Sequence, residues 1–126
     1  DGDFERTLDL VAALRPSWSY TFKYSPREAT AAAGMADDVP DSAKEERLKR
    51  LNALCDKLTE EALSARVGKV VEVLDEEGGF GRTRDGFKVS WKTAGDGGAT
   101  GRLVKVRIAA ASKRVLKGLK EERGYP

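Results

Sequence analysis

The clearest pattern in the sequence is a strict alternation of apolar and charged residues in the second half of the chain. Phe87–Lys92 and Leu103–Ile108 place apolar side chains at every second position, a period typical of strands with one solvent-exposed face. Turns containing glycine separate the strands, at Glu76–Gly79, Arg84–Gly86 and Gly95–Gly98. The pattern therefore predicts an antiparallel meander over residues 67–120 that closes into a small five-stranded OB-like β-barrel.

The alternation also predicts which side chains are buried. The apolar members of the two strands should face inward: Phe87, Val89, Trp91, Val104, Val106 and Ile108. The basic members should face outward: Lys88, Lys92, Lys105 and Arg107. The barrel is thus expected to have an apolar interior and a basic exterior.

Helical patterns dominate the first half of the chain. Phe4, Leu8 and Val11 recur at helical spacing, with Asp3 placed as N-cap and Pro16 just after the end. A second, longer amphipathic helix is predicted from Ser42 to about Ala65, with the capping-box spacing between Ser42 and Glu45. Cys55 falls on the apolar stripe of that helix, which predicts a small core residue.

An aromatic segment lies between the two helices. Aromatic residues alternate with small or polar ones over Trp18–Tyr24, which predicts a strand. A helix followed by a strand is half of a βαβ repeat, so residues 1–66 are interpreted as a remnant of an α/β barrel and the whole chain as α+β. Loops after the strands of such barrels carry active sites, so Ser25 and Arg27 are predicted to face a substrate; a plain connector is the alternative.

The charge is unevenly distributed along the chain. Residues 67–126 contain 13 Lys and Arg against 8 Asp and Glu, a net charge of +5, whereas residues 1–66 contain 10 and 13, a net charge of −3. A basic face on a small barrel is the electrostatic footprint of an RNA or single-strand binder. A solvated surface that only keeps the domain soluble is the competing interpretation.

The composition restricts the chemistry. There is one cysteine, Cys55, and no histidine, so disulfide frameworks, sites built on several Cys or His and the usual general base are excluded. We expect no catalytic residue and no metal site in this chain. Without a long apolar run or a leader pattern, a cytoplasmic location away from membranes is expected.

Several of these segments together resemble MiaB-type tRNA methylthiotransferases, which are radical-SAM enzymes. Tyr20–Arg27 and Thr30–Ala32 resemble the last section of the radical-SAM domain, and Val67–Leu74, Gly81–Thr83 and Gly101–Ile108 resemble the TRAM domain that follows it. The resemblance implies that residues 1–66 are the tail of the radical-SAM domain with a linking helix, residues 67–120 a TRAM barrel and residues 121–126 a tail. One departure is Glu28-Ala29, where the family usually has Pro-Gly.

The family attaches a methylthio group to an isopentenyl-modified adenosine beside the tRNA anticodon, with 4Fe-4S clusters and S-adenosylmethionine as cofactors. The family's CxxxCxxC triplet has no counterpart in this chain, and one cysteine cannot hold a cluster. The resemblance therefore implies a C-terminal part whose TRAM barrel grips the tRNA anticodon arm and whose other partner is the N-terminal portion of the parent enzyme. A branch that acts on threonylcarbamoyl-adenosine stays open as an alternative, whereas Arg27 in Ser25-Pro26-Arg27 resembles the tRNA branch more than the branch that acts on a ribosomal-protein aspartate.

The residues expected to contact RNA are the basic side chains of the barrel together with one aromatic side chain expected to be exposed and to stack on a base. They are Lys69, Phe80, Arg82, Arg84, Lys88, Lys92, Arg102, Lys105 and Arg107. The alternative role is a structural docking or dimerisation module without RNA affinity of its own.

Overall fold

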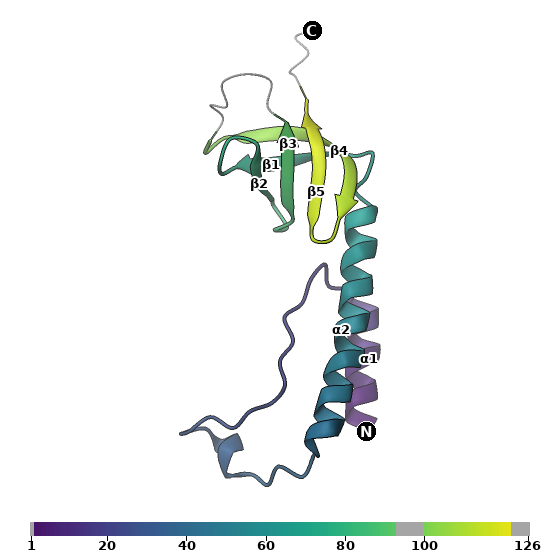
Figure 1. The fold of residues 1–126 in the computed structure, drawn as a ribbon, viewed down its shortest axis with the longest axis vertical. Helices are drawn as coiled ribbons and strands as arrows, with labels where there is room; N and C mark the ends of the chain where they lie inside the picture. The colour runs from purple at the N-terminus through teal and green to yellow at the C-terminus, as the bar shows by residue number, and fades with distance from the viewer. Residues whose placement is uncertain (1, 93–99, 122–126) are drawn as a thin grey trace. The chain divides into compact units, whose positions relative to one another are not determined.

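The computed structural model describes residues 2–92 and 100–121, and the chain divides into two compact units, Asp1–Thr59 and Glu60–Pro126. Two helices and a short 3-10 helix precede five strands, which confirms the α+β class (Figure 1). The elements are α1 (Gly2–Leu14), η1 (Ala31–Gly34), α2 (Asp41–Ser64), β1 (Val70–Asp75), β2 (Phe80–Thr83), β3 (Lys88–Lys92), β4 (Leu103–Ser112) and β5 (Val115–Lys120). The turn predicted at Gly95–Gly98 and residues 122–126 of the predicted tail lie outside the described residues.

Contacts between its two helices hold the first unit together. The guanidinium of Arg50 on α2 donates to both carboxylate oxygens of Glu5 on α1, at 2.8 and 3.0 Å, and lies 5.2 Å from the centre of the Phe4 ring. The predicted helices are confirmed, but α1 begins at Gly2. Asp3 therefore lies in the first turn, paired with Arg6, and not at the N-cap position.

The prediction of a strand at Trp18–Tyr24 is wrong. No residue of this segment pairs with a strand among residues 2–92 and 100–121, and Tyr20 and Phe22 are 75% and 85% exposed. An alternation of period two is a property of any extended chain, and a strand also needs a neighbour for its backbone groups. The interpretation of residues 1–66 as an α/β-barrel remnant thus has no sheet to support it in the described part of the chain.

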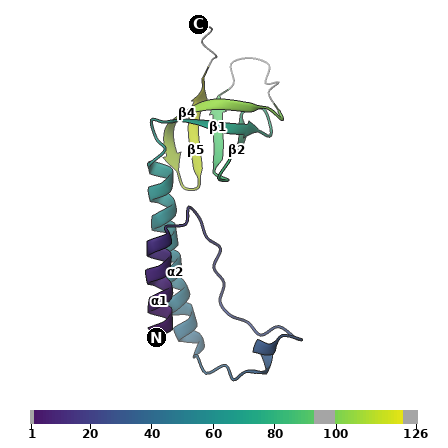
Figure 2. The same ribbon diagram turned by 180° about the vertical axis from the view of Figure 1, so that it is seen from behind.

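The second unit is a closed barrel in the order β1-β2-β3-β5-β4, seen from two sides in Figures 1 and 2. The five-stranded barrel is confirmed, but the prediction that it is antiparallel throughout is wrong, because β3 and β5 are parallel neighbours. The remaining neighbours, β1–β2, β2–β3, β1–β4 and β4–β5, are antiparallel. The meander ends at β3, since β5 separates β3 from β4.

The barrel interior holds the apolar side chains that the alternation assigns to it. Phe87, Val89, Trp91, Val104, Val106 and Ile108 are all buried, together with Val73, Leu116 and Leu63 from the end of α2. Cys55 on α2 is buried as well. Neither helix of the described ranges has the length and apolar character that a bilayer span requires.

Arg66 fastens the end of α2 to the barrel. Its Nη1 donates to the carbonyl oxygen of Ala62 at 2.6 Å, its Nη2 pairs with Asp85, and its guanidinium carbon lies 4.0 Å from the centre of the Phe87 ring. The side chain thereby satisfies a carbonyl of the last helical turn and covers a core aromatic ring.

Candidate nucleic-acid interface

The outer surface of β2, β3 and β5 collects aromatic and basic side chains around Ser90. Phe80 on β2 and Lys117 on β5 are the register partners of Ser90 on either side. In the next row Arg82 is the partner of Lys88. Lys92 lies two residues beyond Ser90 on the same face of β3, about 13 Å along the strand from Lys88. We call this surface the basic face; it consists of Phe80, Arg82, Lys88, Ser90, Lys92 and Lys117.

Phe80 is half-buried, which corrects the expectation that it is exposed. The loop between β1 and β2 folds back onto it: the Phe80 carbonyl accepts hydrogen bonds from the amides of Glu76 and Glu77 at 2.9 and 3.1 Å. The buried carboxylate of Asp75 accepts the amide of Gly78 at 2.6 Å. The ring is therefore held on a rigid strand end, with only part of its surface available to a ligand.

The lysines of the basic face are exposed, and within the described ranges no ion pair engages Lys88, Lys92 or Lys117. Arg82 lies 3.6 Å from Glu76, a distance of weak attraction between exposed groups. The face consequently presents three unneutralised ammonium groups, two on β3 and one on the neighbouring strand β5, where Lys117 lies level with Ser90 between Lys88 and Lys92.

Other predicted RNA contacts lie off this face. Lys105 on β4 is the register partner of Glu72, and Arg107 donates to Glu121 at 2.7 Å. Lys69 precedes β1, Arg84 lies in the turn between β2 and β3, and Arg102 precedes β4; all three are exposed. The structure thus brings together Phe80, Arg82, Lys88 and Lys92 and separates them from the rest of the predicted set.

Sequence reasoning missed Lys117 and Ser90. A signal for Lys117 was present in the sequence, because apolar Leu116 is followed by charged Lys117, as in the alternation of the recognised strands. In the structure Leu116 is buried and Lys117 is exposed. What the sequence lacks is the parallel pairing of β3 with β5, which alone brings Lys117 opposite Ser90. Non-local pairing of this kind is not encoded in any one segment.

The predicted substrate loop forms a defined turn. Thr30 donates its amide and its hydroxyl to the Arg27 carbonyl, at 3.3 and 2.8 Å, and the Tyr24 hydroxyl donates to the Ala32 carbonyl at 3.1 Å. Ala29, at the position where related proteins were expected to have glycine, adopts a left-handed φ of 62°. Ser25 and Arg27 are exposed on this loop, and whether they face a substrate stays a prediction.

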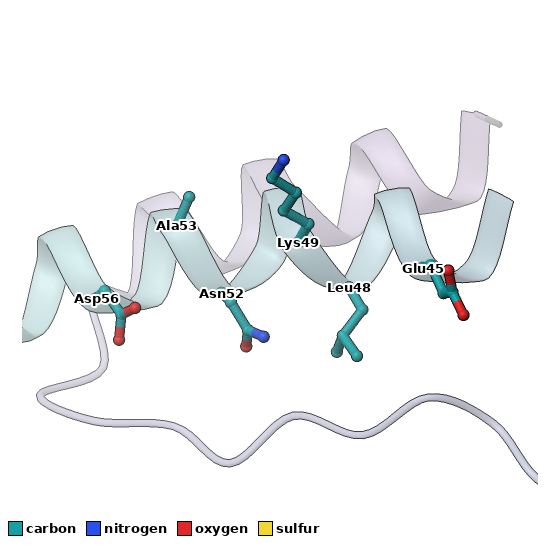
Figure 3. Close-up of a pocket in the computed structure, with 6 residues that line it drawn as sticks. All are labelled: Glu45, Leu48, Lys49, Asn52, Ala53 and Asp56. Atoms are coloured by element: carbon teal, nitrogen blue, oxygen red, sulfur yellow. The ribbon is translucent and has the colours of Figure 1, made fainter. Parts of the chain in front are cut away.

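A shallow hollow of about 430 Å³ lies along α2, lined by Glu45, Leu48, Lys49, Asn52, Ala53 and Asp56. Figure 3 shows that all six side chains come from this one helix and point to different sides of it. Three of the four polar side chains are already engaged: Glu45 by Lys23 at 3.5 Å, Asn52 by the Thr21 hydroxyl, and Asp56 by a contact of its own. The fourth, Lys49, points to the opposite side of the helix from Glu45, Asn52 and Asp56 (Figure 3). The hollow therefore lacks free groups that converge on a ligand.

The residues present do not fit an iron–sulfur cluster. The chain contains one cysteine, and its side chain is buried on α2, whereas a cluster needs three or four thiolates that converge on it. In the described part of the chain, no group of three or more Asp, Glu, Cys or His side chains is placed to hold a metal ion.

Comparison with known proteins shows what the chain is similar to. It is 42% identical over 125 residues to the tRNA-2-methylthio-N(6)-dimethylallyladenosine synthase of Moorella thermoacetica, covering 94% of this chain and 28% of that protein. The protein of the same name in Bacillus subtilis is 41% identical over 125 residues, 94% of this chain and 24% of the relative. That of Kineococcus radiotolerans is 47% identical over 78 residues. The chain spans about a quarter of the length of these curated relatives, and no family model matches it.

Proposed function

The chain corresponds over nearly its whole length to a segment of the MiaB-type tRNA methylthiotransferases, and from this premise we propose that its barrel is a TRAM domain that binds tRNA through the basic face. In this proposal residues 67–120 form the TRAM barrel, and residues 1–66 form the tail of a radical-SAM domain with its linking helix. The parent protein would act on isopentenyl-modified adenosine in tRNA.

The chain's own residues contribute binding and no chemical step. Iron–sulfur clusters and S-adenosylmethionine would supply the radical chemistry elsewhere in the parent protein. Lys88, Lys92 and Lys117 would contact successive phosphates, and the half-buried ring of Phe80 would stack against a base or sugar at the edge of the same face. Arg27, on its rigid turn, would stand near the substrate in the parent protein.

The single observation that carries the proposal is the grouping of unneutralised lysines around Ser90 beside Phe80. A surface that serves only solubility has no need to place an aromatic ring and several ammonium groups on adjoining strands while carboxylates lie elsewhere. Glu72 and Glu121, by contrast, lie against Lys105 and Arg107 on β4. The basic face thus combines an aromatic ring with three ammonium groups that no ion pair balances in the described structure, which is an arrangement that attracts a polyanion.

A charge-reversed variant of the whole chain tests the proposal. Lys88→Glu Lys117→Glu should weaken binding to unmodified tRNA by about a hundredfold, and should lower the slope of log affinity against log salt by on the order of 1 per lost contact. The matched control is Lys49→Glu Lys57→Glu on α2, which makes the same change in net charge on exposed positions. Equal losses in both variants, or binding that ignores salt, would reject the proposal.

A docking role has one observation in its favour. Leu74 and Leu103 are register partners on the outer surface of β1 and β4 and are 43% and 60% exposed, so they form a small apolar patch. It adjoins the basic face, because Leu74 is also the register partner of Arg82. Sedimentation velocity separates the two roles. A monomer that binds tRNA supports the first role, and an obligate dimer without RNA affinity supports the second.

A further inference from the structure

Two turns leave the barrel side by side because β3 and β5 are parallel. Lys88, the first residue of β3, is the register partner of Val115, the first residue of β5. The turn that leads into each strand therefore lies at the same end of the barrel, as Figures 1 and 2 show. In an antiparallel arrangement the two turns would lie at opposite ends.

Both turns are basic. The turn between β2 and β3 carries Arg84, and the turn between β4 and β5 carries Lys113 and Arg114. We propose that Arg84 and Lys113 form a second RNA contact, here called the basic rim, which binds the phosphate backbone of a base-paired stem while the basic face holds the unpaired nucleotides next to it. This inference rests on the proposed function and adds to it a second contact surface on the barrel, with the paired and unpaired parts of the RNA divided between the rim and the face.

Asp85 is the one carboxylate in these two turns, and it does not neutralise the positive charge of the basic rim. The Thr83 hydroxyl donates to Asp85 at 2.6 Å, and Arg66 pairs with the other carboxylate oxygen of Asp85. The negative charge of Asp85 is therefore balanced by Arg66, which follows the end of α2. In the part of the chain that the structure describes, no ion pair engages Arg84 or Lys113. Arg114 has an interaction of its own, and the rim does not depend on it.

The backbone of Lys113 supports a functional reason for the side chain. Lys113 has a φ of 53°. This left-handed conformation is unfavourable for residues that carry a Cβ atom and costs glycine nothing. A two-residue hairpin turn of this kind favours glycine or asparagine. Strained positions that keep a less suitable residue are typical of functional sites, and a lysine at the tip of a turn extends furthest toward a ligand.

The chemistry of the rim differs from that of the face. Neither turn contains an aromatic residue, so it offers no surface on which an unpaired base can stack. A base-paired A-form stem hides its bases and presents phosphates and 2′-hydroxyls, which point charges bind without reading sequence. The two turns project beyond the strands, so they can reach a backbone that continues past the end of the basic face.

The test compares two RNAs: a stem-loop, and its loop sequence as a single strand. In the full chain, Arg84→Gln Lys113→Gly should lower affinity for the stem-loop by about tenfold and reduce its salt slope by on the order of 2, with the single strand affected less than about twofold. Lys113→Gly removes strain, so the thermal midpoint should not fall and lost binding cannot be attributed to unfolding. Lys49→Gln Lys57→Gln on α2 is the charge-matched control.

The outcomes separate the rim from the face. Equal losses for both RNAs, no loss for the stem-loop, or the same loss in the α2 control would each overturn the rim. If the rim variant binds both RNAs like the parent while Lys88→Glu Lys117→Glu binds neither, the proposed function stands and the rim fails. If the parent chain binds neither RNA, the proposed function fails together with the rim.

Discussion

Single side chains at the join between α2 and the barrel illustrate how local charge is balanced. Partial burial acts to raise the pKa of Asp85, but the hydrogen bond from the Thr83 hydroxyl and the positive charge of Arg66 together outweigh it, so the pKa lies below its usual 3.8. A lowered pKa in the folded state means that the ionised carboxylate stabilises the fold above the usual value. That contribution is lost as the pH falls through the lowered pKa.

Asp85→Asn should therefore destabilise the chain at neutral pH and not in strong acid. We expect a loss of about 1 kcal/mol in the free energy of unfolding, because the group is half-exposed and solvent weakens its ion pair. The measurement is urea unfolding of parent and variant at neutral pH and at a pH well below 3.8. A difference between them that persists unchanged in acid would show that the charge of Asp85 plays no part.

At the scale of single residues, the sequence predicts burial well and exposure less well. Alternation correctly placed Val89 and Val106 inside the barrel, where both are fully buried, because the period of a strand is a local property. It could not show that Phe80 is half-buried, since the fold around it depends on the β1–β2 loop. Amides of that loop bind the Phe80 carbonyl, and the buried Asp75 carboxylate accepts the Gly78 amide within it. The burial of Phe80 on β2 thus depends on Asp75, a residue of β1.

At the scale of secondary-structure elements, closure of the barrel depends on a close approach between the backbones of β4 and β5 at Gly118. A methyl group built on Gly118 of β5 would lie 2.4 Å from the Arg107 carbonyl oxygen and 2.6 Å from Val106 Cγ1. The register of β4 against β5 shifts between Ile108 and Ala110, directly opposite Gly118 and Lys117. This irregularity bends β4 over β5, and only glycine leaves room for the bend.

Gly118→Ala should consequently destabilise the barrel by about 3 kcal/mol, because the contact atom belongs to the backbone and cannot rotate away. Urea unfolding followed by tryptophan fluorescence measures the loss, because Trp91 is buried in the barrel core and becomes exposed on unfolding, whereas Trp18 is already exposed in the folded chain. Gly34→Ala in η1, where no atom lies within 4 Å of the added methyl group, is the matched control and should change stability by less than about 0.5 kcal/mol. Equal effects would contradict the close-approach argument.

Element types follow from the sequence more readily than their partners do. Both helices and the strands β3 and β4 were predicted from periodicity, whereas Trp18–Tyr24 has the same alternation as β4 and forms no ladder in the described structure. The difference lies in what is available to pair with each segment, which periodicity does not record. The parallel β3–β5 pairing was missed for the same reason, and with it the position of Lys117 on the basic face.

On the scale of the whole molecule, charge and aromatic content together set the kind of RNA recognition. The second half of the chain carries a net charge of +5. Phe87 and Trp91 are buried, which leaves Phe80 as the aromatic residue on the outer surface of the described strands. Lysine ammonium groups bind phosphates as point charges, while sequence is read by contacts to base edges. Under the proposed function, the described surface therefore offers groups that grip RNA and few that choose among sequences.

We accordingly predict that the chain binds unrelated stem-loops of equal length with affinities within about threefold of one another, because phosphate contacts carry no sequence information. Competition measurements with stem-loops of scrambled loop and stem sequences, at one fixed salt concentration, check this. A single sequence bound more than about tenfold more tightly would require a base-specific contact worth about 1.4 kcal/mol. In that case Phe80→Leu and Arg82→Lys would show whether the aromatic ring or the guanidinium of the basic face supplies that contact. If the affinities are equal, any sequence selectivity of a longer protein that contains this segment has to come from its other parts.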